Sequence, residues 1–295
     1  MTDSPDTQVL AIDGGGTRCR IALIRGNDRR VIEVGSANVT TDFDSAVRCL
    51  HEGIETLAKH SDTRPQTLHA LPAFVGLAGV TGQTIVDRLT AALPLRNVHY
   101  ADDRLAALRG ALGRGDGLVA HCGTGSFFAA QLAGTHRLAG GWGSVLGDEA
   151  SAQWVGRAAL SQLLHQVDGF IPSSAMIEEF RTQFSTATEV VEFARTATPA
   201  ALGALAPQVT AHAQTGDPAA LKIMQRATEH ITLTLTQMGW TTGTPICLTG
   251  GIGPHYAPYF TDLLKGDLTK PQGEPLDGAI ALAQERGKEI AHGHC

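Results

Sequence analysis

Residues 13–17 read Asp-Gly-Gly-Gly-Thr and directly follow an apolar run. Because Gly14, Gly15 and Gly16 have no side chains, their N–H groups can approach a bulky ligand and bind phosphate oxygens. Thr17 adds a hydroxyl donor to this set. Asp13 would be repelled by phosphate and would act through a magnesium ion, with water between them. The stretch therefore predicts a phosphate loop, although a glycine-rich hairpin turn is the alternative.

Two later glycine turns extend this prediction. A loop at the end of a second apolar run consists of Gly123, Thr124, Gly125 and Ser126. Two Gly/Thr loops could hold one polyphosphate from both sides. A third turn follows the apolar sequence ICLT and contains Gly250 and Gly251. Glycine at such a turn allows a flat ring to lie on the backbone. Three such loops in this order predict a nucleotide site.

Two consecutive carboxylates, Asp102 and Asp103, stand where a predicted strand meets a predicted helix. One acid at such a junction is commonly an N-cap. The second is then free to point towards a substrate. A general base for a sugar hydroxyl needs a carboxylate within hydrogen-bond reach. The pattern alone does not decide which of the two aspartates would be that base.

Two further segments contain residues that suit sugar recognition. Trp142 lies in a loop rich in glycine, which includes Gly141, and Asp148 follows that loop. Aromatic faces and acids together are typical of sugar sites. Asp148 could instead cap the next helix. Asn38 follows a predicted strand, as a turn residue or as a reader of hydroxyl groups.

The elements around these residues follow one plan that occurs twice. Residues 8–13 are typical of a buried strand, and residues 18–25 and 29–35 are expected to continue as an antiparallel meander. The order of strand, Gly/Thr turn, strand, turn and strand begins again near Gly113, with little residue identity. A long helical stretch covers about residues 148–240. The pattern predicts an α/β fold with two similar halves.

Composition argues against several other classes of protein. The 23 Lys and Arg residues against 29 Asp and Glu give a formal net charge of −6, which argues against binding to nucleic acid or an anionic membrane. The five cysteines form no Cys-x-x-Cys pair, so their spacing indicates neither a zinc nor an iron–sulfur site. The N-terminus lacks a signal-peptide pattern, and no apolar run reaches the ~18–20 residues that span a bilayer. We expect a cytoplasmic protein.

The order of the motifs resembles one known family. Along the chain they read IDGGGTRCRIAL, GSAN, DDRLAALRGALG, GTGS, GGWGSVLGDEASA, ICLTGGI and KPQGEPLDGAIALA. Together they resemble the bacterial glucosamine kinases and N-acetylglucosamine kinases of the BadF/BadG/BcrA/BcrD-type ATPase family, within the sugar kinase/actin/heat-shock-70 superfold. The resemblance runs from about Val9 to Ala283. It implies two ribonuclease H-like (actin-like ATPase) domains with an interdomain cleft, built from mixed sheets flanked by helices.

The resemblance also implies a role for each candidate residue. Asp13–Thr17 and Gly123–Ser126 look like the two phosphate loops, with Asp13 near the magnesium through water. Gly250 and Gly251 look like the adenosine motif. Asp103 rather than Asp102 matches the family's base. The positions that match sugar contacts are Asn38, Asp103, Gly141, Trp142 and Asp148.

The activity implied is phosphorylation of the 6-hydroxyl of N-acetylglucosamine or glucosamine by ATP with Mg²⁺, in the catabolism or recycling of amino sugars or cell-wall sugars. The loop around Trp142 favours an N-acetyl group, whereas KPQGEPLDGA and IDGGGTRCR read closer to the glucosamine kinases. One alternative is a kinase of another hexosamine, such as a muramic acid derivative. Others are an activator ATPase, which would need iron–sulfur cysteines, and a non-enzymatic sugar or nucleotide sensor.

Domain limits and partners complete these expectations. Residues 1–112 are expected to form the N-terminal actin-like domain, with a C-terminal helix at about 275–295 packing back on it. Residues 113–274 are expected to form the C-terminal domain with a helical insertion. The expected partner is a small-molecule amino sugar, with no nucleic acid and no membrane. Relatives of this kind are commonly homodimers, which is the expectation for the assembly.

Overall fold

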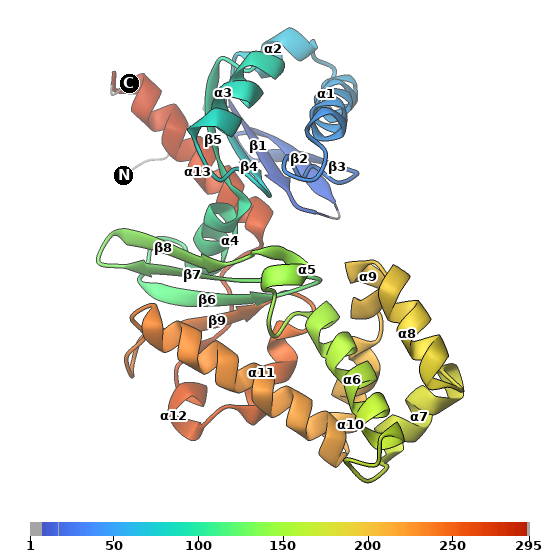
Figure 1. The fold of residues 1–295 in the computed structure, drawn as a ribbon. Helices are drawn as coiled ribbons and strands as arrows, with labels where there is room; N and C mark the ends of the chain where they lie inside the picture. Colours follow the sequence, from blue (N-terminus) through green and yellow to red (C-terminus); the bar gives the residue numbers. More distant parts are fainter. Residues whose placement is uncertain (1–7, 17, 294–295) are drawn as a thin grey trace. The chain divides into compact units, whose positions relative to one another are not determined.

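The computed structural model describes residues 8–16 and 18–293. The chain divides into two compact units. The first unit contains residues up to Arg114 and residues from Pro271 onward, and the second contains Gly115–Lys270. Each unit has its own five-stranded sheet with helices around it (Figure 1). Among the described residues, none of the helices has both the length and the apolar character needed to cross a membrane.

The sheet of the first unit has the order β3-β2-β1-β4-β5. Its strands are β1 (Gln8–Gly14), β2 (Cys19–Arg25), β3 (Asp28–Val34), β4 (Pro72–Leu77) and β5 (Asn97–Asp102). The first three strands form an antiparallel meander, whereas β4 runs parallel to β1 and β5 runs parallel to β4. Because β1, β4 and β5 are parallel, their carboxyl ends lie at one edge of the sheet.

Helices cover both faces of this sheet. They are α1 (Phe43–His60), α2 (Pro65–His69), α3 (Gln83–Ala92), α4 (Asp103–Leu112) and α13 (Pro275–Ala291). Alternate residues of β1 point to opposite faces of the sheet. Leu10 and Ile12 belong to the hydrophobic cluster that includes buried residues of α1. Val9 and Ala11 belong to the cluster that includes residues of α4 and α13. The two helices on the second face, α4 and α13, pack closely on each other, because a Cβ on Gly278 of α13 would lie 1.9 Å from the carbonyl oxygen of Ala106 in α4.

The second unit repeats the strand plan of the first. Its sheet has the order β10-β9-β6-β7-β8. The strands are β6 (Gly117–Cys122), β7 (Ser126–Leu132), β8 (Thr135–Gly140), β9 (Ile246–Thr249) and β10 (Leu268–Thr269). Strands β6, β7 and β8 form an antiparallel meander, and β9 runs parallel to β6. The α/β class and the two similar halves predicted from the sequence are thereby confirmed.

The helices of the second unit lie mostly between β8 and β9 in the chain. They are α5 (Gly143–Leu146), α6 (Ala152–Val167), α7 (Ala175–Gln183), α8 (Ala187–Thr196), α9 (Pro199–Gly203), α10 (Ala206–Gln214), α11 (Pro218–Gln237), the 3₁₀ helix η1 (Gly253–Tyr259) and α12 (Asp262–Lys265). Their core is large, and the Tyr256 hydroxyl inside it donates to the carbonyl oxygen of Ala150 at 2.7 Å. This bond satisfies a polar group that burial would otherwise leave unpaired.

Candidate active site

The first glycine loop connects β1 to β2 in the first unit. The Gly15 N–H donates to the Arg18 carbonyl at 2.9 Å, which closes the turn. Gly14 is packed so tightly that a Cβ there would lie 2.5 Å from Leu77 Cδ2, whereas nothing lies within 4 Å of a Cβ on Gly16. The loop therefore has one glycine required by packing and one that faces open space, as a phosphate loop needs. Thr17 lies outside the described residues.

Asp13 stands at the end of β1 and is held by a basic partner. It is opposite Arg20 in the ladder of β1 and β2, and an Arg20 amino group donates to Asp13 Oδ2 at 2.8 Å. The other amino group of Arg20 pairs with Glu274, the N-cap of α13. Burial raises the pKa of the Asp13 carboxyl above its ordinary value, and Arg20 opposes that shift. The sequence reasoning missed Arg20, because its link to Glu274 spans 254 residues.

Asp102 and Asp103 occupy different environments. Asp102 is the N-cap of α4, and its Oδ1 accepts the backbone N–H of Arg104 at 3.0 Å. Its two oxygens also accept the Arg104 guanidinium at 2.7 and 2.8 Å. This bidentate pair fixes Asp102 in place. Asp103 is the first residue of α4, and no ion pair to its carboxyl is found among the described residues. Its predicted role as the base stays a prediction.

Sheet register brings Asp13 and Asp103 to the same edge. Asp13 is level with Gly76 of β4, and the next residue of β4, Leu77, is level with Asp102 of β5. A Cβ on Gly76 would lie 3.4 Å from the Cα of Asp103, so glycine there allows the start of α4 to settle over β4. Three acids therefore gather around one strand end in the first unit.

The pKa of Asp103 is raised by burial and by the neighbouring acids. Burial, the charges of Asp102 and Asp13, and a hydrogen bond with Asp102 raise the pKa of Asp103 to about 8, and Arg104 acts in the opposite direction. A carboxylate with a pKa near the working pH is a more effective proton acceptor than an ordinary aspartate. The site therefore suits general-base chemistry.

The raised pKa predicts a pH-dependent stability. The folded protein binds more protons at Asp103 than the unfolded chain between about pH 4 and pH 8, so this group's contribution to the free energy of unfolding falls as the pH rises through that window. We expect Asp103→Asn to gain stability relative to the wild type over the same window, with a melting temperature higher by roughly 2–4 °C at pH 8 for each kcal/mol recovered. Thermal unfolding of both proteins from pH 5 to pH 9 measures this, and a constant difference would contradict it.

Asn38 lies beside the first glycine loop. The neighbouring Ala37 N–H donates to the Gly15 carbonyl at 3.2 Å. Asn38 Oδ1 accepts the N–H groups of Thr40 and Thr41 at 2.9 and 3.1 Å, so the side chain forms a turn. Its amide nitrogen is not used by that turn. The residue thus serves as a turn residue, and its predicted contact with a sugar hydroxyl stays a prediction.

The second glycine loop connects β6 to β7 in the second unit. Within it the Gly123 N–H donates to the Gly125 carbonyl at 2.8 Å. The Ser126 hydroxyl donates to the Glu149 carbonyl at 2.6 Å, so this hydroxyl is engaged within the protein. Thr124 is exposed. Gly123 also accepts the Ala152 N–H at 2.8 Å, which ties the loop to the start of α6.

Asp148 is a structural partner of this second loop. Its carboxylate is buried and accepts Gln153 Nε2 at 2.7 Å and the Ser126 N–H at 3.4 Å. A Cβ on Gly125 would lie 2.9 Å from Asp148 Oδ2, so the loop passes close over the carboxylate. Asp148 does not cap the next helix, because α6 begins at Ala152 with Ser151 as its N-cap. The predicted sugar contact of Asp148 stays a prediction.

The two glycines of the third turn differ in their surroundings. Gly250 has a φ of +79°, and a Cβ there would lie 2.3 Å from the Cys122 carbonyl oxygen. Gly251 is exposed, with nothing within 4 Å of a Cβ. Gly250 therefore holds the turn against β6, and Gly251 presents open backbone on which a flat ring could lie.

The glycine-rich loop of the second unit carries exposed apolar side chains. Trp142 is 69% exposed, and Val145 and Leu146 of the short helix α5 are 90% and 82% exposed. The preceding Gly141 is tied to the second glycine loop, because its N–H donates to the Ser126 carbonyl at 2.9 Å. The sequence predicted a flexible loop here, and the structure adds α5.

The donors present fit a magnesium ion held mainly by water and phosphate. Mg²⁺ is usually bound through one or two carboxylates and keeps several waters. Among the described residues no three His, Cys, Asp or Glu side chains form a cluster that could enclose a metal. The Asp13 carboxylate lies at a strand end, and Arg20 engages one of its oxygens. One carboxylate at the first glycine loop would be a sufficient protein ligand for an ion that arrives with a nucleotide.

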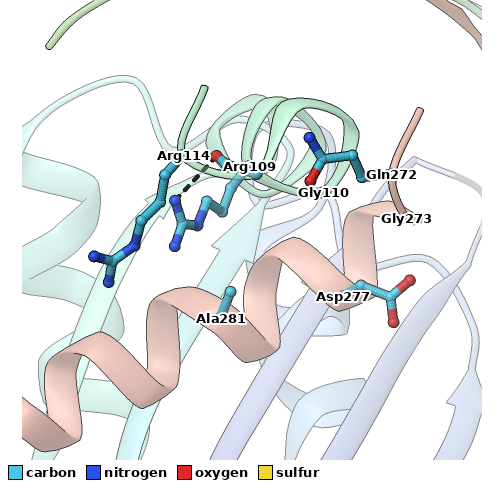
Figure 2. A pocket seen from close by; sticks show the side chains of 8 residues that line it. Arg109, Gly110, Arg114, Gln272, Gly273, Asp277 and Ala281 are labelled. Atoms are coloured by element: carbon cyan, nitrogen blue, oxygen red, sulfur yellow. Dashed lines mark hydrogen bonds between the residues drawn. The ribbon is translucent and has the colours of Figure 1, made fainter. Parts of the chain in front are cut away.

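A cavity elsewhere in the first unit contains none of the predicted site residues. Its volume is about 330 Å³, and it is lined by the end of α4, the start of α13 and Gln272 and Gly273 (Figure 2). Arg109 and Arg114 each donate to Glu285 Oε1 at 2.6 Å. This shared ion pair joins α4 to α13.

Two known proteins resemble this chain over nearly its whole length, and a third resembles about half of it. It is 26% identical over 278 residues to the glucosamine kinase GspK of Vibrio cholerae, covering 93% of this chain and 95% of that one. It is 26% identical over 166 residues to the N-acetylmuramic acid/N-acetylglucosamine kinase of Clostridium acetobutylicum, covering 54% of each. A solved structure from Chromobacterium violaceum, described as a candidate N-acetylglucosamine kinase, is 27% identical with a TM-score of 0.81, covering 95% of this chain and 100% of that one.

The fold likeness confirms the predicted sugar kinase/actin-like architecture. Residues 10–274 match the family that the motifs predicted. This chain therefore belongs to the BadF/BadG/BcrA/BcrD ATPase family.

Proposed function

We propose that this protein is an ATP-dependent amino-sugar kinase that phosphorylates the 6-hydroxyl of N-acetylglucosamine or glucosamine. The observation that carries the proposal is that two adjacent aspartates occupy different environments. Asp102 is fixed by Arg104, and Asp103 retains a carboxyl with a raised pKa at the strand edge that also bears Asp13. The kinase names of the similar proteins support the same reaction class.

In the proposed reaction Asp103 accepts the proton of the sugar 6-hydroxyl. The hydroxyl oxygen forms a bond to the γ-phosphorus, and the bond from that phosphorus to the bridging oxygen of ADP breaks. Backbone N–H groups of the glycine loops hold the phosphate oxygens as their charge spreads. Asp13 would hold a Mg²⁺ ion through water, and that ion would neutralise phosphate charge. Arg20 keeps the Asp13 carboxylate oriented.

The loop of the second unit favours an N-acylated substrate. From Gly140 to Gly147 it contains no charged residue, and it exposes Trp142, Val145 and Leu146. Of the two acids that follow the loop, Asp148 is buried and bonded to Gln153, whereas Glu149 Oε2 lies 3.7 Å from the position of a Cβ on Gly147. An acetyl group gains from contact with the exposed apolar side chains of this loop. We therefore infer a preference for N-acetylglucosamine over glucosamine.

A coupled assay of ADP release with MgATP tests this proposal. Parallel reactions contain N-acetylglucosamine, glucosamine, N-acetylmuramic acid, glucose or no sugar. We expect release at least about tenfold above the sugar-free rate with N-acetylglucosamine, a difference of ~1.4 kcal/mol in barrier. Phosphorus NMR of the product should place the phosphate on the 6-oxygen. Faster ADP release with glucosamine than with N-acetylglucosamine would overturn the inferred acyl preference. Equal rates of ADP release in every reaction would overturn the assignment as a sugar kinase.

A further inference from the structure

His121 lies at the carboxyl end of β6, immediately before the second glycine loop. It is level with Phe127 on β7 and with Thr249 on β9. The imidazole stacks on the Phe127 ring, with centroids 4.7 Å apart and planes inclined by 13°. Its Nδ1 is 3.1 Å from the Thr249 hydroxyl oxygen. Two neighbours therefore fix the plane of the ring and occupy one of its nitrogens.

The other ring nitrogen faces the second loop. His121 Nε2 lies 3.1 Å from the position that a Cβ on Gly123 would take. It has no hydrogen-bond partner in the part of the chain that the structure describes. A half-buried ring nitrogen without a protein partner is positioned to bond to a ligand.

The protonation state of the ring restricts what it can do. Burial lowers the pKa of His121 to about 4, so the imidazole is neutral at pH 7. A neutral imidazole has one N–H donor and one acceptor nitrogen. If the Thr249 hydroxyl donates to Nδ1, the proton is on Nε2 and points towards the loop. A phosphate oxygen near Nε2 would select this tautomer, because it accepts hydrogen bonds only.

The geometry points to His121 as a further nucleotide-contacting residue, whose Nε2–H donates a hydrogen bond to a phosphate oxygen held by the Gly123–Ser126 loop. This inference rests on the proposed function, since it requires that the loop binds a nucleotide. The Thr249 hydroxyl would hold the donor tautomer in place, and Phe127 would hold the ring plane. Both neighbours are then positioning residues.

Calorimetric titration of the full chain with ADP and with adenosine tests the inference. His121→Phe keeps the stack on Phe127 and removes the donor. A hydrogen bond to a charged group corresponds to roughly 10- to 100-fold in affinity. We expect His121→Phe to lose that much affinity for ADP and less than about twofold for adenosine, with a melting temperature near that of the wild type. His230→Phe is the matched control, because His230 is also half-buried in the second unit and packs near Phe128.

A second readout does not depend on the variant. In ¹⁵N-labelled wild-type protein, the Nε2 resonance of His121 should show the protonated tautomer and should shift on addition of ADP but not of adenosine. Equal losses of ADP and adenosine affinity in His121→Phe, or an Nε2 signal unmoved by ADP, would overturn the inference and leave the kinase proposal standing. Wild-type protein that binds neither ligand would overturn the kinase proposal and the inference with it.

Discussion

Replacing Asp103 with asparagine is expected to reduce kcat by about 10²- to 10⁴-fold, the usual contribution of a general base. Asparagine has nearly the same shape but cannot accept the hydroxyl proton. The affinity for ADP should stay within about twofold, because the proposed phosphate loops are unchanged. Steady-state kinetics with MgATP and the best sugar, together with calorimetric titration of ADP, measure both quantities. A kcat near that of the wild type would refute the assignment of the base.

Asp102→Asn is the matched control for this variant. Asparagine is as good an N-cap as aspartate, so α4 should keep its first turn. The variant loses the charge that pairs with Arg104 and that contributes to the raised pKa of Asp103. We therefore expect kcat to fall by less than about tenfold, since the proton acceptor remains. In the wild type, kcat/KM for the sugar should rise with pH as Asp103 ionises, and in Asp102→Asn that rise should begin at lower pH. A larger kcat loss in Asp102→Asn than in Asp103→Asn would show that Asp102, and not Asp103, is the base.

Local signals in the sequence predicted much of the fold. Asp42, Thr198 and Asp217 each stand before a helical pattern in the sequence, where such residues favour capping, and each caps its helix through its side chain. The meanders followed from apolar runs separated by glycine turns. Such signals depend on neighbours in the chain, so the sequence displays them directly. The same is true of Asp102, whose capping bond is to a residue two positions away.

The parts that the sequence did not predict depend on distant residues. Arg20 contacts Asp13 across a ladder and Glu274 across most of the chain. Gly76 is required because α4 settles over β4, and the packing of a helix on a neighbouring strand leaves no local pattern. Asp148 precedes a helical segment in the sequence, but its φ of +61° and its bonds to Ser126 and Gln153 remove it from the capping position. Tertiary contacts outweigh local preference at such positions.

The second large expected effect is a loss of stability when Gly250, in the third glycine turn, is replaced by alanine. Gly250→Ala would place a methyl group 2.3 Å from the Cys122 carbonyl oxygen and 2.7 Å from the Gly123 nitrogen, both of them backbone atoms. The φ of +79° adds strain for any residue with a side chain. Because no flexible side chain can yield, the end of β6 or the turn itself must move. We expect a loss of several kcal/mol, which is about 6–12 °C in melting temperature.

Gly251→Ala separates stability from ligand binding at the same turn. Its new methyl group would enter open space, because nothing lies within 4 Å of that position. The melting temperature should therefore stay within about 1–2 °C of the wild type, the range of ordinary surface substitutions. If the flat adenine ring lies on this backbone, the methyl group displaces it, and the affinity for ADP should fall about tenfold. Unfolding scans and ADP titrations of both variants decide the matter. An unchanged ADP affinity in Gly251→Ala would remove Gly251 from the nucleotide site, and an unchanged melting temperature in Gly250→Ala would show that the turn can shift away from β6 at little cost.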